Sequence, residues 1–199
     1  SAEREPLARF DARVGETVAA AGERVELCAA PRAEAMAQLV RRLAYDGRIR
    51  HLRDEAFFEW RFRNPLHEYR FLFAGGAALE GYLVLKWSCA ARAPSPRVQI
   101  VDLEAATASV LQALLVAAIE VGRFPELATW RATRSPAVVD ALGRSGFEAV
   151  DGEGAGHDRP CILVRCLAEG RGHRDWTLQG VPLLELSRWD MRMLYTMAG

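Results

Sequence analysis

Hydrophobic residues recur at two different spacings along this chain, and the spacing predicts which segments are strands and which are helices. Short β-prone runs bounded by glycine, proline or polar residues predict strands, whereas apolar positions three and four residues apart predict helices. We expect strands at residues 24–28, 69–73, 81–87, 98–103, 127–132, 147–150 and 161–167. We expect helices at residues 31–47, 53–62, 107–121 and 136–144, the last capped by Ser135.

The two ends of the chain differ from this regular middle. Residues 1–22 are polar and rich in alanine and glutamate, which predicts an N-terminal helical arm that ends at Gly22. The main domain is expected over residues 23–168, with a glycine-rich loop near its end. Residues 169–199 are too apolar for a disordered tail. We therefore expect them to form a C-terminal extension that packs on the domain or on a partner.

The order of the elements predicts how the strands pair. Residues 69–73 and 81–87 form a hairpin around a glycine turn and are therefore antiparallel. The succession of strand 98–103, helix 107–121 and strand 127–132 requires a crossover, which makes those two strands parallel. The expected fold class is α+β, with a mixed, mostly antiparallel sheet flanked by helices and containing one parallel strand pair.

Composition narrows the classes of protein to consider. The 199 residues suit one domain, and 26 acidic residues balance 26 basic ones, which argues against partners such as nucleic acid or acidic membranes. No apolar run approaches the ~18 residues of a membrane span, and no leader opens the chain, so we expect a cytoplasmic protein.

The four cysteines form no CxxC pair and lie at no metal-like spacing from a histidine, which predicts reduced thiols and no metal site. Lys86 is the only lysine, a bias that indicates a GC-rich bacterial genome.

Three stretches resemble a known family. They are the hairpin YRFLFA…GYLVLKW, the strand VQIVDL that leads into a long helix, and SPAVVDALGRSGFEAV, in which Gly-Phe follows a helix and precedes a strand. In this order they resemble the GNAT superfamily of acyl-CoA N-acyltransferases over residues 24–167. The stretch FFEWRFRNPLHEYRFLF is similar to bacterial GNAT-like proteins, some of which carry two such domains in tandem.

The resemblance implies a donor site and a reaction. The strands at 98–103 and 127–132 would separate, and the pantetheine arm of acyl-CoA would bond to the backbone of the first strand. The donor-binding positions implied are Ile100, Val101, Asp102, Leu103, Thr107, Ala108, Ser109 and Ser135. Asp102 or Glu104 would help to deprotonate the acceptor. The implied function is transfer of an acyl group, such as acetyl, from acyl-CoA to an unidentified amine, without a metal.

Two departures from the family's pattern support a second hypothesis. The family binds the donor's diphosphate with an Arg/Gln-x-x-Gly-x-Gly/Ala loop, but residues 102–109 contain neither arginine nor glycine and hold two carboxylates. The family's catalytic tyrosine corresponds to Leu142, so a proton donor would have to come from Tyr45, Tyr69, Tyr82 or Tyr195. The alternative is a catalytically inactive GNAT-like binding or interaction module, half of a tandem protein or part of a homodimer.

Charged residues leave two further interpretations open. Asp102 and Glu104 are either site carboxylates or solvated charges at the end of a strand. An arginine cluster near Trp60 either holds a phosphate or an acidic substrate, or forms ion pairs with nearby acidic side chains. The arginines are Arg48, Arg50, Arg53, Arg61 and Arg63, and the acidic candidates are Asp46, Asp54, Glu55 and Glu59.

Overall fold

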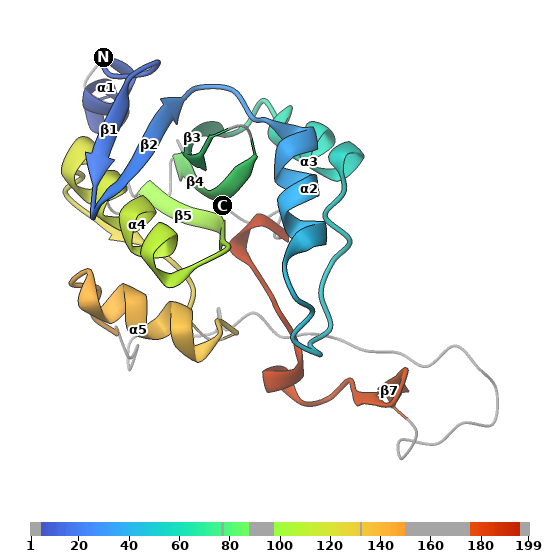
Figure 1. The fold of residues 1–199 in the computed structure, drawn as a ribbon. Coiled ribbons are helices and arrows are strands. Elements are labelled where there is room, and N and C mark those ends of the chain that lie inside the picture. The colour runs from blue at the N-terminus through green and yellow to red at the C-terminus, as the bar shows by residue number, and fades with distance from the viewer. Residues whose placement is uncertain (1–4, 77, 88–97, 132, 150–175, 196–199) are drawn as a thin grey trace.

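A computed structural model describes residues 5–76, 78–87, 98–131, 133–149 and 176–195. Within these ranges six strands form one sheet in the order β1-β2-β3-β4-β5-β6, with helices on both faces (Figure 1). All neighbouring strands are antiparallel except β5 and β6, which are parallel. The predicted α+β class, with a mixed and mostly antiparallel sheet and one parallel pair, is confirmed.

The elements have the following bounds. The strands of the sheet are β1 (Thr17–Ala20), β2 (Glu23–Cys28), β3 (Glu68–Gly75), β4 (Leu79–Trp87), β5 (Val98–Ala105) and β6 (Leu127–Ala128). The helices are α1 (Glu5–Asp11), α2 (Ala33–Arg42), α3 (Glu55–Phe62), α4 (Ala108–Gly122) and α5 (Pro136–Arg144). Near the C-terminus lie the hairpin of β7 (Thr177–Leu178) and β8 (Val181–Pro182) and the 3-10 turns η3 (Leu186–Arg188) and η4 (Met193–Tyr195).

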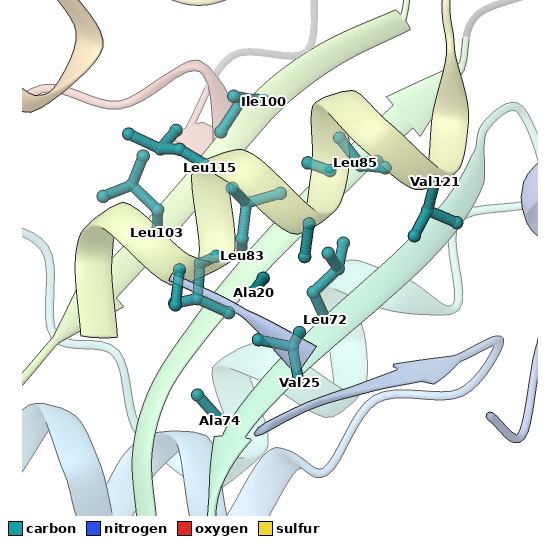
Figure 2. Close-up of a cluster of buried hydrophobic side chains, with 14 of the residues drawn as sticks. Ala20, Val25, Leu72, Ala74, Leu83, Leu85, Ile100, Leu103, Leu115 and Val121 are labelled. Atoms are coloured by element: carbon teal, nitrogen blue, oxygen red, sulfur yellow. The ribbon is translucent and has the colours of Figure 1, made fainter. Parts of the chain in front are cut away.

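Helix α4 covers one face of the sheet because it is apolar around most of its circumference. Figure 2 shows Leu115 and Val121 of this helix above Leu83 and Leu85 of β4. The helix lies so close to the sheet that a Cβ atom at Gly81 would be 2.4 Å from Cγ1 of Val110. A glycine on β4 therefore permits the packing that forms this half of the core.

Helices α2 and α3 cover the other face, where the core is largely aromatic. Phe58 of α3 packs edge-on against Tyr82 of β4, with ring centroids 6.0 Å apart. Asp54 caps α3 by accepting a hydrogen bond from the backbone N–H of Phe57 at 2.8 Å. This face carries the polar residues described below.

Three sequence predictions need correction. The expected helical arm over residues 1–22 is helical only in α1, and β1 extends the sheet where a helix was expected. Gly22 ends no helix, because it forms a two-residue hairpin turn with Ala21; their φ angles of +85° and +47° are those of a type I′ turn. Residues 147–149 form no strand, and the expected strand at 161–167 lies outside the described residues.

Two further element boundaries differ from the prediction. Helix α2 ends at Arg42, five residues before Gly47. The last strand of the sheet covers two residues rather than the six expected at 127–132.

Among the described residues, none of the helices combines the length and the apolar character that a membrane span requires.

Candidate functional site

The parallel strands β5 and β6 stay together only briefly. They pair at Val98 with Leu127 and at Gln99 with Ala128, and the side chain of Thr129 then donates to the carbonyl oxygen of Ile100 at 3.0 Å. Strand β5 continues to Ala105, whereas β6 ends at Ala128. The two strands therefore no longer pair beyond residue 100.

A β-bulge lies at the same point of β5. Leu85 of β4 pairs with Ile100, but the next residue, Val84, pairs with Asp102, so Val101 is an extra residue in the ladder. A bulge bends its strand and changes the direction of nearby side chains. Asp102 consequently lies on the face covered by α2 and α3, opposite Val84.

The C-terminal segment, residues 189–195, lies beside β5 beyond this bulge. Figure 1 shows the red chain end passing between β5 and helix α2 toward the centre of the molecule. The 3-10 turn η4 contacts β5, and Nη1 of Arg192 donates to the carbonyl oxygen of Leu103 at 2.6 Å. A backbone acceptor that β6 leaves free is thus bonded by the chain's own C-terminal segment.

Hydrogen bonds to backbone groups of the C-terminal segment hold it at two places. The N–H of Asp190 donates to the carbonyl oxygen of Ile49 at 2.8 Å, and the hydroxyl of Thr133 donates to the carbonyl oxygen of Met191 at 2.6 Å. The rings of His51 and Tyr195 lie 4.1 Å apart. The segment is therefore attached both to the loop that precedes α3 and to the loop that follows β6.

Asp102 is the centre of a buried polar network. Its side chain is 0% exposed and accepts hydrogen bonds from the Tyr82 hydroxyl at 2.8 Å, from Arg192 at 2.7 Å and from Arg53 at 3.2 Å. The backbone N–H of Leu103 donates to the same carboxylate at 3.0 Å. Both carboxylate oxygens are satisfied within the protein.

Two further carboxylates complete the network. Glu104 pairs with Arg192 at 2.7 Å and also with Arg53. Asp190 pairs with Arg192 at 2.8 Å. Arg192 therefore contacts all three carboxylates, which lie on β5 and on the C-terminal segment. Arginine suits this position because its planar guanidinium group has five donors in a fixed arrangement.

The charges of this network set the protonation states of its members. Burial on its own would raise the pKa of Asp102, but Arg53 and Arg192 outweigh it and lower the pKa to about 2. Burial raises the pKa of Tyr82 well above its usual value, and the Asp102 charge raises it further. Burial likewise raises the pKa of Tyr195 to about 12. At neutral pH Asp102 is therefore a carboxylate and both tyrosines are protonated.

The depressed pKa predicts how stability depends on acid. A carboxyl group whose pKa is lower in the folded protein stabilises the fold above its unfolded pKa near 4, and this contribution disappears as pH falls toward about 2. We expect Asp102 to contribute about 2–3 kcal/mol that is lost over this interval. Urea unfolding between pH 2 and pH 6 measures it. If the free energy of unfolding of Asp102→Asn falls as steeply with decreasing pH as that of the unchanged protein, the assignment is contradicted.

The start of α4, where the resemblance places a diphosphate, is already engaged by side chains. The Thr107 hydroxyl accepts from the N–H of Val110 at 3.2 Å, and the Ser109 hydroxyl donates to the carboxylate of Glu23 at 3.2 Å. Ala108 is exposed, and its methyl side chain offers phosphate no hydrogen-bond donor. A neighbouring carboxylate offsets the attraction of a helix N-terminus for an anion.

The remaining predicted donor-site residues are divided between elements. The side chain of Ile100 faces α4, whereas that of Val101 packs with the aromatic core under α2 and α3. Ser135 caps α5, accepting from the N–H of Val138 at 3.4 Å. Leu142 is buried in the core with α4 and supplies no proton donor. Of the positions predicted for the donor and the base, Asp102, Leu103 and Glu104 meet in the network, together with the candidate residues Tyr82 and Arg53.

Three arginines of the predicted cluster form ion pairs, but not all with the acidic residues expected. Arg48 pairs with Asp46 at 2.6 Å and Arg63 pairs with Glu59 at 3.6 Å, as the ion-pair interpretation expects. Arg53 differs, because it is buried and pairs with Asp102 instead of its acidic neighbours in sequence. No sequence signal pointed to Arg192 or Asp190.

A surface groove lies elsewhere on the molecule. It has a volume of about 670 Å³ and opens between the start of α2 and helix α3. Residues 31–35, Glu55, Glu59, Phe62 and Arg63 line it. None of these residues belongs to the network around Asp102.

Among the described residues, no group of three or more His, Cys, Asp and Glu side chains has a metal-site arrangement.

Comparisons with known proteins add one weak likeness. No family model matches the chain. No curated protein matches it either. Among solved structures, the chain is similar to a point mutant of TTHA1254 from Thermus thermophilus, with a TM-score of 0.42 and 13% identity. The match covers 73% of this chain and 99% of that one. At this level the likeness bears on neither family nor function, so the functional argument rests on the site.

Proposed function

We propose that this chain is a GNAT-like domain that works as a binding or interaction module rather than as an acyltransferase. One observation carries the proposal: Arg192 of the C-terminal segment bonds to the backbone of Leu103 and pairs with Asp102 and Glu104. An acyl donor of the kind the resemblance implies would use that same part of β5. The C-terminal segment and the donor would therefore exclude each other.

The protonation of the network supports the same conclusion. A general base for an amine works best with a pKa near the operating pH. Asp102, with a pKa of about 2, does not accept a proton at neutral pH, and Glu104 is paired with two arginines. The carboxylates expected to activate the acceptor amine instead serve as structural counter-ions.

Calorimetry with acyl-CoA tests the proposal. We expect the intact chain to release no heat of binding with acetyl-CoA or with longer acyl-CoAs at concentrations up to about 1 mM, a level that detects weak binding. Saturable heat in that range, with turnover of any amine, would contradict the proposal. The interaction partner of such a module would be a second GNAT domain or another copy of this chain.

The separation of β5 and β6 favours a second candidate, an N-acyltransferase that acts when the C-terminal segment is displaced. The strand pairing ends before residue 101, and the hydroxyl of Tyr82, which donates to Asp102 on β5, would be the proton donor. If this candidate is correct, Arg192→Met will bind acyl-CoA when the intact chain does not. The matched control is Arg188→Met, which changes an exposed arginine that lies just before the same segment and pairs with Glu185; this variant should bind none.

A further inference from the structure

A second polar cluster lies on the same face of the sheet, where β3 and β5 begin and β4 ends. The strand register places Lys86 of β4 directly beside Tyr69 of β3 and Gln99 of β5. Side chains at directly opposite positions of neighbouring strands have Cβ atoms about 5 Å apart and share one face. The three side chains therefore form one row across the sheet.

Two of the three side chains in this row are buried, and the polar atoms of the row lack partners among the described residues. Lys86 is 1% exposed and Tyr69 is 5% exposed. The Tyr69 hydroxyl and the Oε1 atom of Gln99 have no hydrogen-bond partner within the part of the chain that the structure describes. The ammonium group of Lys86 has neither a hydrogen bond nor an ion pair with any residue in the described part of the chain. Buried polar groups are normally satisfied, and a buried charge is normally paired.

Among the described residues, the charged group that acts on Lys86 is a cation, Arg61. Burial lowers the pKa of Lys86, and the neighbouring Arg61 lowers it further. Burial also lowers the pKa of His67, with Lys86 and then Arg61 adding to the effect. The ring of His67 lies edge-on to Tyr69 at 6.1 Å. No carboxylate of the described residues pairs with Lys86, in contrast to the balanced network around Asp102.

The sequence marks the same residue. Lys86 is the only lysine among 26 basic residues, so every other basic position is an arginine. An ammonium group is compact and donates three hydrogen bonds as a point charge, whereas guanidinium is planar and larger. The single lysine ammonium group therefore lies at a buried position where no carboxylate of the described residues pairs with it.

We propose that Lys86 and Tyr69 bind an oxyanion, the carboxylate or phosphate group of a small-molecule ligand, at this end of β3, β4 and β5. The ammonium and the hydroxyl are both donors, and an anionic oxygen would satisfy both. Gln99 would add its amide N–H. His67 and Gln99 are only partly buried, so the row reaches the surface at this end of the sheet. The site is separate from the network around Asp102, and its failure would leave the proposed function untouched.

The single lysine gives a direct test. In protein labelled with lysine enriched in ¹³C at Cε, the one labelled residue yields one NMR signal. We titrate it separately with inorganic phosphate and with acetate, keeping ionic strength constant with sodium chloride. We expect a saturable shift with at least one anion. Tyr69→Phe should weaken the affinity about fivefold to tenfold, as expected for loss of one hydrogen bond to a charged group.

The controls separate a specific site from general charge effects. Arg63→Ala removes an exposed arginine close in sequence to Arg61 and should leave the titration unchanged. Saturation by phosphate alone assigns a phosphate ligand, and saturation by acetate alone or by both anions extends the site to carboxylates. A signal that follows neither anion up to about 20 mM, where even millimolar binding would saturate, overturns the proposal. So does a shift that Tyr69→Phe leaves unaltered.

Discussion

Asp102→Asn will lower the free energy of unfolding by about 3–5 kcal/mol. The substitution keeps the shape of the side chain but removes the charge that Arg53 and Arg192 face inside the protein. Both arginines then remain buried with only Glu104 and Asp190 to compensate them. Urea unfolding followed by circular dichroism measures the loss, which is a large part of the roughly 5–15 kcal/mol typical of a domain.

A matched substitution separates burial from charge. Asp46→Asn removes a carboxylate that pairs with Arg48 but whose side chain is 44% exposed. Exposed ion pairs contribute about 0–1 kcal/mol, so this variant should stay close to the unchanged protein. If the two variants lose similar amounts of stability, the network around Asp102 is not the buried structure described above.

Arg192→Met will have the second largest effect, a loss of about 2–4 kcal/mol. Methionine retains much of the volume of the side chain but leaves Asp190 with only Arg48, 4.0 Å away. It also removes the hydrogen bond to the carbonyl oxygen of Leu103. Urea unfolding measures the loss, and hydrogen exchange should show faster opening of residues 189–195.

The control for this variant lies just before the same segment. Arg188→Met removes an arginine whose side chain is 55% exposed and which pairs with Glu185. It should change stability by less than about 0.5 kcal/mol and leave the exchange of the C-terminal segment as it was. Equal effects of the two arginines would mean that the segment is not held through Arg192.

Local features of the sequence predicted much of this fold. Adjacent residues alone predicted the glycine turn between β3 and β4 and the start of α5 at Ser135-Pro136. The structure has both elements at these places. The crossover rule gave the one parallel pair because connection lengths restrict strand direction. Such elements depend on contacts close in the chain, which spacing describes well.

Features that depend on distant residues were not predictable in this way. Strand β1 has only four residues, and it is a strand because it pairs with β2. Asp102 was a candidate from its place at the end of a strand, but its partners Arg53 and Arg192 lie 49 and 90 residues away in the chain. No periodicity connects such positions, so the role of Asp102 as a structural counter-ion emerged only from the fold.

The burial of Lys86 could likewise not be predicted from the sequence. The composition shows that Lys86 is unique, but the pattern of residues 81–87 is that of an ordinary hairpin strand. The burial of Lys86 without a partner follows from the helices that cover this face and from the side chains on β3 and β5 beside it.

A double-mutant cycle between Asp102 and Arg192 tests most directly whether the C-terminal segment occupies the place beside β5. Urea unfolding of the intact chain, Asp102→Asn, Arg192→Met and the double variant gives the coupling energy of this one pair. The account predicts a coupling of about 2 kcal/mol or more, as for buried charges in direct contact. Losses that add within about 0.5 kcal/mol would contradict it, because independent sites add in this way.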